Sequence, residues 1–446
     1  MASDITEIEA AATETVGARY ASLLTLRKAR RDPIGFLQGL APTGDAVPFA
    51  LAGQPALLLG HPAAIEDVLV THGTRFVKPP ALTRAARLLG QGLLTADAAR
   101  HTARRRAIAP GFHRARMTGY GAIVAAHAGR RAAAWRDGDV VDVVDEMASL
   151  ALGIAGEALF SADLAPLAGE LREVLAVAVA GIDPLVALVA PRRQLRPARA
   201  RLEAIVQTLI VRRLADPDPP DDLLGLLLAA DGPEATPEQL LDDAITLLLA
   251  SHDTIANAMA WTWGWLATQP AAAVALRAEV DAVLGAGLGA ASLSADDLPR
   301  LPYTRAVLAE SLRLRPPAWI LARRALEDHH GPAGPIAAGT LVVMSPYLVH
   351  RDARFFADPL RFDPGRWLAA NIPPRPKLAY FPFGAGRRAC IGEGLAWLEG
   401  VLALATLARR WTLQSIGSPP ALDARITLRP RGPMLMRLVV RRHDAA

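Results

Sequence analysis

The sequence from residue 381 to residue 394 reads FPFGAGRRACIGEG and contains Cys390, the only cysteine in the 446-residue chain. Four glycines and two arginines surround this cysteine, and an apolar run that predicts a helix begins just after it. Unpaired backbone N–H groups and the positive end of a helix dipole stabilise a thiolate at such a position. The stretch therefore predicts a turn that presents a thiolate of lowered pKa, suited to binding a metal.

A lone cysteine is more often a small hydrophobic residue of the core, and this alternative applies to Cys390. The four neighbouring glycines argue against it, because each costs about 1 kcal/mol relative to alanine inside a helix. They suit a loop whose backbone must approach a large flat group closely.

The pattern Phe383-Gly-x-Gly-x-Arg388-x-Cys390-x-Gly392 resembles the haem-binding signature of the cytochrome P450 family at every defining position. This resemblance implies that Cys390 is the axial ligand of haem b, where a thiolate favours O–O cleavage. It also implies that Phe383 packs near the sulfur, that Gly392 belongs to the cofactor site and that Arg388 binds a propionate. Many bacterial members carry histidine at the position of Arg388.

A long helix is predicted to begin at Thr236, where Thr-Pro-Glu-Gln forms a capping box with proline in the first helical position. About 32 residues follow before Pro270, and the apolar character from Ala244 onward predicts a buried helix. Ala250 and Thr254 lie at i and i+4 on one side, which leaves space beside a hydroxyl for dioxygen.

Two interpretations of Asp253 and Thr254 stay open from the helix alone. Thr254 can donate its hydroxyl to the carbonyl four residues earlier while Asp253 meets a basic neighbour, or both residues can handle protons. The P450 resemblance implies the second interpretation, with Asp253 and Thr254 as catalytic residues and Ala250 beside the cofactor. Ser251 stands where the family most often has glycine.

His101 and Arg105 project side by side from a predicted helix, so they can hold two oxygens of a buried anion. For either residue alone, a solvated basic face is the alternative. The resemblance implies that both bind haem propionates together with Arg323, which follows an apolar run that predicts a strand over residues 318–324. Arg324 is the fallback, because successive strand residues point to opposite faces.

Glu310 and Arg313, at i and i+3 on a helix predicted over residues 303–315, resemble part of the family's Glu/Arg/Arg network behind the haem. Arg366 completes the resemblance, although Gly365 replaces the more usual glutamate. On a surface, such a pair would contribute only a few tenths of a kcal/mol. The resemblance also implies four substrate contacts: Trp319, Ile320, Leu321 and Met434.

Local patterns predict several further elements. Residues 47–59 predict a small hairpin, residues 62–72 a helix, and residues 76–96 a long loop of the kind that lines binding sites. Residues 5–30 predict another helix, and the apolar residues 182–190 could roof a pocket.

Composition adds limits on class and partners. The net charge is +5, yet basic clusters such as residues 104–106 lack interleaved aromatics, so nucleic-acid binding is not expected. The N-terminus carries neither a signal peptide nor an apolar run of about 20 residues, which predicts a cytoplasmic protein without a membrane anchor. Arg387, with Arg104 and Arg106, would offer a positive surface to an acidic redox partner.

The resemblance implies a mainly α fold with a smaller β-rich part, a single P450 domain over residues 1–446 and haem between the long central helix and the cysteine loop. The resemblance implies a monomeric monooxygenase that acts on a hydrophobic small molecule such as a terpenoid, carotenoid, fatty acid or polyketide. Electrons would come from a separate ferredoxin or flavodoxin with its reductase, since no reductase domain follows. A haem-thiolate isomerase or dehydratase, and a non-catalytic haem sensor, are the alternatives.

Overall fold

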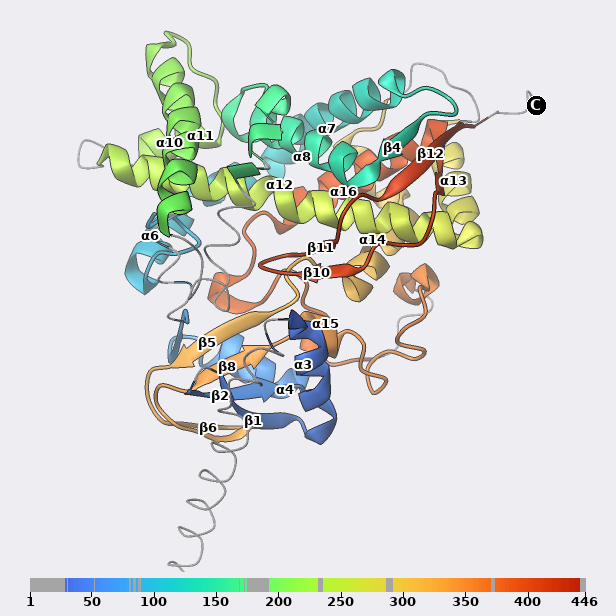
Figure 1. Cartoon of the computed structure of the whole chain (residues 1–446). Helices are drawn as coiled ribbons and strands as arrows, with labels where there is room; N and C mark the ends of the chain where they lie inside the picture. The colour runs from blue at the N-terminus through green and yellow to red at the C-terminus, as the bar shows by residue number, and fades with distance from the viewer. Residues whose placement is uncertain are drawn as a thin grey trace, which may run out of the picture.

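The computed structural model describes most of the chain. The main described ranges are residues 31–51, 53–79, 90–167, 192–231, 236–285, 292–369 and 374–441, and a few residues between or before them are also described. Figure 1 shows a large helical part and a smaller β-rich part below it, as the sequence predicts. Almost all of the helix predicted over residues 5–30, and all of residues 182–190, lie outside the described residues.

The β-rich part carries a five-stranded sheet in the order β1-β2-β8-β5-β3. Strands β1 (Ala46–Leu51) and β2 (Gln54–Leu59) pair antiparallel and form the predicted hairpin. Strand β8 (Leu341–Met344) runs parallel to β2 and antiparallel to β5 (Leu321–Ala325), and β3 (Phe76–Val77) pairs with β5 at the edge. Trp319 and Ile320 therefore precede the strand that was predicted to include them.

Helix α12 (Pro237–Thr268) crosses the helical part and contains 32 residues, as the sequence predicts (Figure 1). It begins where the Thr236 hydroxyl accepts a hydrogen bond from the Gln239 N–H at 3.4 Å. Helices α8 (Val143–Phe160), α14 (Pro302–Leu314) and α16 (Glu393–Arg410) pack against it. The apolar character of α12 on nearly all sides is thus explained by its neighbours.

The remaining helices connect and cover these elements. They are α3 (Pro33–Leu40), α4 (Pro62–Glu66), α6 (Ala98–Ile108), α7 (Arg114–Ala134), α10 (Arg192–Ala215), α11 (Leu223–Asp231), α13 (Pro270–Leu284) and α15 (Pro346–Val349). Within the described residues, none of the helices is both long enough and apolar enough to cross a membrane.

Short strands complete the fold. They are β4 (Val140–Asp142), β6 (His329–Gly331), β7 (Gly334–Ile336), β9 (Trp411–Ser415), β10 (Leu422–Ala424), β11 (Leu428–Pro430) and β12 (Leu435–Val440). Strand β12 pairs with both β4 and β9, whereas β10 and β11 form a separate hairpin.

Candidate active site

A cavity of about 1700 Å³ is lined by α12 on one side and by the loop that carries Cys390 on another. Most of its surface is apolar, contributed by segments from every part of the chain. The apolar lining includes Phe36, Leu94, Leu247, Ile255, Ile320 and Leu395. The cavity therefore suits a large hydrophobic guest together with a flat cofactor.

The turn before Cys390 has its shape because of its glycines. Gly384 and Gly386 have φ values of +69° and +70°, a region that favours glycine. A side chain at Gly386 would also collide with the carbonyl of Leu69. The Cys390 N–H donates to the Phe383 carbonyl at 2.9 Å, which closes the turn with the thiol facing the cavity.

The charge state of this thiol differs from the expectation. The Cys390 side chain is exposed to the open space of the cavity, yet desolvation by the protein around it raises the pKa of the thiol above its ordinary value, and the Gly392 N–H and the Arg105 guanidinium offset this only in part. The prediction of a lowered pKa is therefore wrong for the protein alone, because desolvation outweighs the helix terminus. A bound cation of high charge would reverse the balance, since a coordinated thiol is deprotonated.

One face of α12 opposes the thiol across the same cavity. Ala250, Ser251 and Thr254 line it, and the Thr254 hydroxyl donates to the Ala250 carbonyl at 3.1 Å. The Asp253 side chain accepts a hydrogen bond from the Thr427 hydroxyl at 2.7 Å and is not part of the lining. Thr254 thus makes the hydrogen bond to the carbonyl four residues earlier that the first interpretation predicts. Asp253 does not meet the basic neighbour of that interpretation, because its partner is the Thr427 hydroxyl.

Basic side chains gather at one part of the cavity wall. His101, Arg105, Arg323 and Arg388 all line it, as does Lys78. The Arg105 guanidinium donates to the Ala389 carbonyl at 2.7 Å, so it also supports the cysteine turn. Arg324 is not part of the lining, whereas Leu321, Ala322 and Arg323 of β5 are, so Arg323 lies on the cavity side.

These basic groups perturb one another. Burial, followed by repulsion from Arg388, lowers the pKa of His101 to about 4 and that of Arg323 to about 10. Burial and the same repulsion lower the pKa of Lys78 to about 7. Such a cluster gains stability when a dianionic group binds, so these residues fit the propionates of a haem.

Lys78 was not predicted from the sequence. It lies just after β3 in the stretch predicted as a long loop, and its ammonium group donates to the carbonyls of Leu93 and Leu94. No periodic pattern marks such a position, because only the folding of one loop back on another brings Lys78 to the cavity.

Glu399 is a second residue that sequence analysis missed. It lies on α16 nine residues after Cys390, is 3% exposed and lines the cavity. Burial raises the pKa of this carboxyl well above its ordinary value, so the neutral form is favoured. The sequence did contain a signal for Glu399. Leu395, Glu399 and Leu402 stand at i, i+4 and i+7, so this glutamate lies within an apolar stripe of the helix.

Three of the four predicted substrate contacts line the cavity, namely Trp319, Ile320 and Leu321. Met434 does not: it packs against Gly264 toward the far end of α12, and its N–H donates to the Asp142 carboxylate at 2.9 Å.

The placement of Met434 in the pocket is therefore corrected. Pairing of β12 with β4 draws it away, and the reversal between β10 and β11 reaches the cavity instead, through residues 424–426. The Trp319 indole N–H holds this reversal by donating to the Arg425 carbonyl at 2.7 Å.

The predicted acid–base network lies behind the cysteine loop and is buried. Arg313 pairs with Glu310 through two bonds of 2.8 Å, and Arg366 approaches the same carboxylate at 3.1 Å. Arg313 also donates to the His350 carbonyl at 2.7 Å, and the His350 ring accepts the Phe381 N–H at 2.9 Å. The network is thus connected to the first residue of the cysteine stretch.

One expected surface residue is buried. Arg104 is 8% exposed and pairs with Asp243 of α12, so it cannot contribute to a docking surface. Arg106 and Arg387 are exposed. The expected positive surface therefore loses one of its three members, because a buried carboxylate on the neighbouring helix attracts it.

Comparison with known proteins agrees with this arrangement. Residues 22–437 match the family model for cytochrome P450. Cyclooctatin synthase of Streptomyces melanosporofaciens is 37% identical over 86% of each chain, and cyclooctat-9-en-7-ol 5-monooxygenase of the same organism is 34% identical over 86% of each. Pentalenene oxygenase of Streptomyces avermitilis is 31% identical over 90% of this chain and 94% of its own. The chain therefore belongs to the cytochrome P450 family and is a monooxygenase of that family.

Proposed function

We propose that this P450 hydroxylates a hydrophobic terpenoid, with haem b held by Cys390 and with electrons from a separate ferredoxin or flavodoxin. The observation that carries the proposal is one cavity whose wall holds the Cys390 thiol, the Ala250–Thr254 face of α12 and a cluster of basic side chains that lower one another's pKa. Most of the cavity surface is apolar, and a volume of about 1700 Å³ leaves room for a polycyclic guest beside the cofactor.

Each group of residues has a defined part in this proposal. Haem bound there would supply oxygen activation, because a thiolate ligand favours O–O cleavage. Lys78, His101, Arg105, Arg323 and Arg388 would hold its propionates, and Arg105 would also keep the cysteine turn in place. Phe383 and Gly392 would shape the surroundings of the sulfur, since both line the cavity next to Cys390.

The α12 residues would manage protons. The Thr254 hydroxyl faces the cavity and can pass a proton to a group bound there while its oxygen remains near the Ala250 carbonyl. Asp253, held by the Thr427 hydroxyl, would supply protons from the side of α12 that points away from the cavity.

The substrate class is proposed from two arguments. Most of the cavity surface is apolar, and Ile320, Leu321 and Ile426 provide apolar contacts for a guest. The relatives with 37%, 34% and 31% identity carry names that refer to cyclooctatin, cyclooctat-9-en-7-ol and pentalenene. A cyclic terpene hydrocarbon or terpene alcohol is the best candidate.

A redox partner would dock beside the cysteine turn. The exposed Arg387 belongs to the short helix η10 (Gly386–Arg388), three residues before Cys390. An acidic ferredoxin or flavodoxin complements this charge, and the attraction should weaken as ionic strength rises.

The function is tested with the haem-loaded protein, NADPH, a surrogate ferredoxin with its reductase and a panel of cyclic terpenes. Product that gains one oxygen atom from labelled O₂ supports the proposal. Turnover that needs neither NADPH nor the redox partner would instead indicate an isomerase or dehydratase.

Substituting Lys78 by glutamine is expected to speed haem loss about 10-fold or more, because a charge-assisted hydrogen bond to a propionate contributes about 1.5–3 kcal/mol. The sign of its pH dependence follows from the lowered pKa of about 7. That value belongs to the site before haem binds, and a bound propionate would raise it. Haem binding therefore takes up a proton at Lys78 above about pH 7, so the haem affinity of the wild type should weaken as the pH rises above about 7.

The rate of haem transfer to excess apomyoglobin measures this from about pH 6 to about pH 9, a range that brackets the lowered pKa of Lys78. Lys377 is exposed and provides the control, so its change to glutamine should leave the rate unaltered. Equal rates for Lys78→Gln and wild type at every pH would remove Lys78 from the propionate site.

Replacing Thr254 with alanine is expected to lower product formation about 100-fold while NADPH consumption continues, because a positioned proton donor typically contributes 10²–10⁴-fold. Product and NADPH are measured in the same reaction. Thr268 offers a matched control on α12, since its exposed hydroxyl makes the same backward bond, to the Gly264 carbonyl at 3.3 Å. Thr254→Ala with the product yield of Thr268→Ala would contradict the role.

A further inference from the structure

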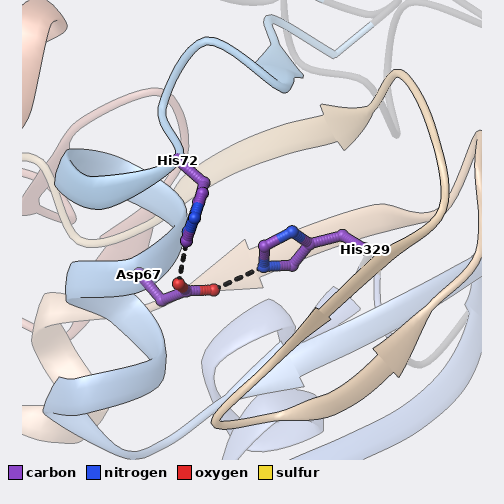
Figure 2. A group of neighbouring side chains, drawn as sticks. All are labelled: Asp67, His72 and His329. Atoms are coloured by element: carbon purple, nitrogen blue, oxygen red, sulfur yellow. Dashed lines mark hydrogen bonds and ion pairs between the residues drawn. The ribbon is translucent and has the colours of Figure 1, made fainter.

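A cluster of Asp67, His72 and His329 lies outside the cavity described above. Asp67 begins the π-helical turn η2 (Asp67–Thr71), His72 follows the end of that turn, and His329 begins β6. Figure 2 shows the carboxylate of Asp67 between the two imidazole rings, which approach it from different elements. We propose that these three side chains form a binding site for one divalent transition-metal ion, with Zn²⁺ as the best match.

The donor set supports this assignment. Two imidazole nitrogens and one carboxylate are a set that zinc uses in sites that keep a fourth position for water. Each of the three residues offers one ligand atom, and these three atoms lie within 4.8 Å of one another. His72 Nδ1 and His329 Nε2 are the ring nitrogens that face the Asp67 carboxylate. Imidazole with carboxylate favours zinc over Mg²⁺ or Ca²⁺, which prefer oxygen ligands.

The three residues are held in place without an ion. The Asp67 oxygens accept hydrogen bonds of 2.6 Å each from His72 Nδ1 and His329 Nε2. Phe76 packs edge-on against the His329 ring at 5.2 Å between centroids. An ion would therefore bind to side chains whose directions are already fixed, which lowers the entropic cost of binding.

Access and space also fit an ion. The His72 side chain is 38% exposed, whereas that of His329 is 2% exposed, so the site is rigid on one side and open to water on the other. Gly331 lies against the cluster, where a side chain would fall 2.9 Å from His329 Nε2 and even closer to Asp67. The absence of a side chain there keeps the surroundings of two ligand atoms clear.

Proton positions set the strength of binding. In the hydrogen-bonded form, each neutral imidazole carries its proton on the nitrogen that faces the carboxylate, because a carboxylate only accepts. An ion replaces both protons, which move to the opposite ring nitrogens. His72 then donates to solvent, but His329 Nδ1 is buried with no hydrogen-bond partner in the part of the chain that the structure describes. We therefore expect micromolar affinity, weaker than that of a closed structural zinc site.

The position of the site gives the ion a local consequence. Its ligands lie at both ends of η2, and Leu69 in the middle of this turn touches Gly386 of the cysteine loop. A bound ion fixes η2 to the β6–β7 hairpin and so stabilises the backbone behind that loop.

The test uses the haem-loaded protein after treatment with a chelator. Zn²⁺ is titrated in by calorimetry, with a chromophoric chelator as competitor, for wild type, His72→Ala, His329→Gln and His330→Ala. His330 is the matched control, because it is exposed and adjacent to His329 but outside the cluster. Wild type and His330→Ala should bind one equivalent, and loss of either ligand should weaken that binding at least about 100-fold, since even outer-shell changes cost 10–100-fold.

Thermal unfolding provides a second measurement. Zn²⁺ should raise the unfolding midpoint of wild type and of His330→Ala but not that of His72→Ala, because only the native site binds the ion. His72 is partly exposed, so its variant is expected to fold and keep haem even if His329→Gln does not. Zinc binding of equal strength in His72→Ala and wild type, or no stoichiometric binding in wild type, would overturn the site.

Discussion

Changing Cys390 to alanine is expected to abolish monooxygenase product formation while leaving a measurable fraction of the haem bound. The thiol is the group on the cavity wall that can provide a thiolate ligand, and that ligand favours O–O cleavage. Haem retention depends on other contacts, because the cation cluster and the apolar walls do not involve the sulfur. The variant therefore separates cofactor binding from catalysis.

The measurement compares product formed per bound haem in Cys390→Ala and wild type, with haem content determined after denaturation. Circular dichroism of both proteins checks that the helical fold is retained. Product formation per haem within about 10-fold of wild type would contradict the assignment, since a change of 1.4 kcal/mol already gives that factor.

Replacing Arg313 with methionine is expected to destabilise the protein by about 3–5 kcal/mol, because it leaves the Glu310 carboxylate buried without its main partner. Both side chains are fully buried, and the guanidinium also donates to three backbone carbonyls, those of His350, Pro359 and Arg361. The loss is large compared with the 5–15 kcal/mol that ordinarily separates folded and unfolded states. Haem content should fall as well, since His350 accepts the Phe381 N–H at the start of the cysteine stretch.

Arg300 and Asp297 provide the matched control for this network. They also pair at i and i+3, at 2.8 Å, but the arginine side chain is 55% exposed. Arg300→Met should therefore cost less than about 1 kcal/mol. The urea midpoint of unfolding is measured for both variants. Equal midpoints would show that the buried Glu310–Arg313 pair contributes no more to the free energy of unfolding than the exposed pair does.

Local sequence patterns predicted most of the fold and part of the candidate site. The capping residues and unbroken apolar run predicted α12, and two apolar runs around a Gly-Gln-Pro turn predicted the β1–β2 hairpin. Each of these inferences depends on neighbouring residues only, which is where sequence patterns are most reliable.

The errors arose where distant segments meet. Met434 was misplaced because it directly precedes β12, and the pairing of that strand with β4, almost 300 positions earlier, decides where it lies. Arg104 is buried because Asp243 of α12 pairs with it. Lys78 lies in a loop and lines the cavity, and no pattern among its neighbours in the sequence predicts that position.

The pKa of Cys390 was predicted with the wrong sign for a related reason. The glycine turn and the following helix are visible in the sequence, and their N–H groups do lower the pKa. The depth of the surrounding cavity is not visible there, and its desolvation dominates. A thiolate at this position therefore needs a cation beside it, which is consistent with a role as a metal ligand.

The central claim is that Cys390 binds haem iron as a thiolate. The reduced carbon monoxide difference spectrum of the purified wild-type protein tests it most directly, because the position of the Soret band reports the ligand opposite carbon monoxide. We predict the strongly red-shifted Soret band of thiolate ligation in wild type and its loss in Cys390→Ala. A wild-type spectrum without that band, in protein that retains haem, would contradict the assignment.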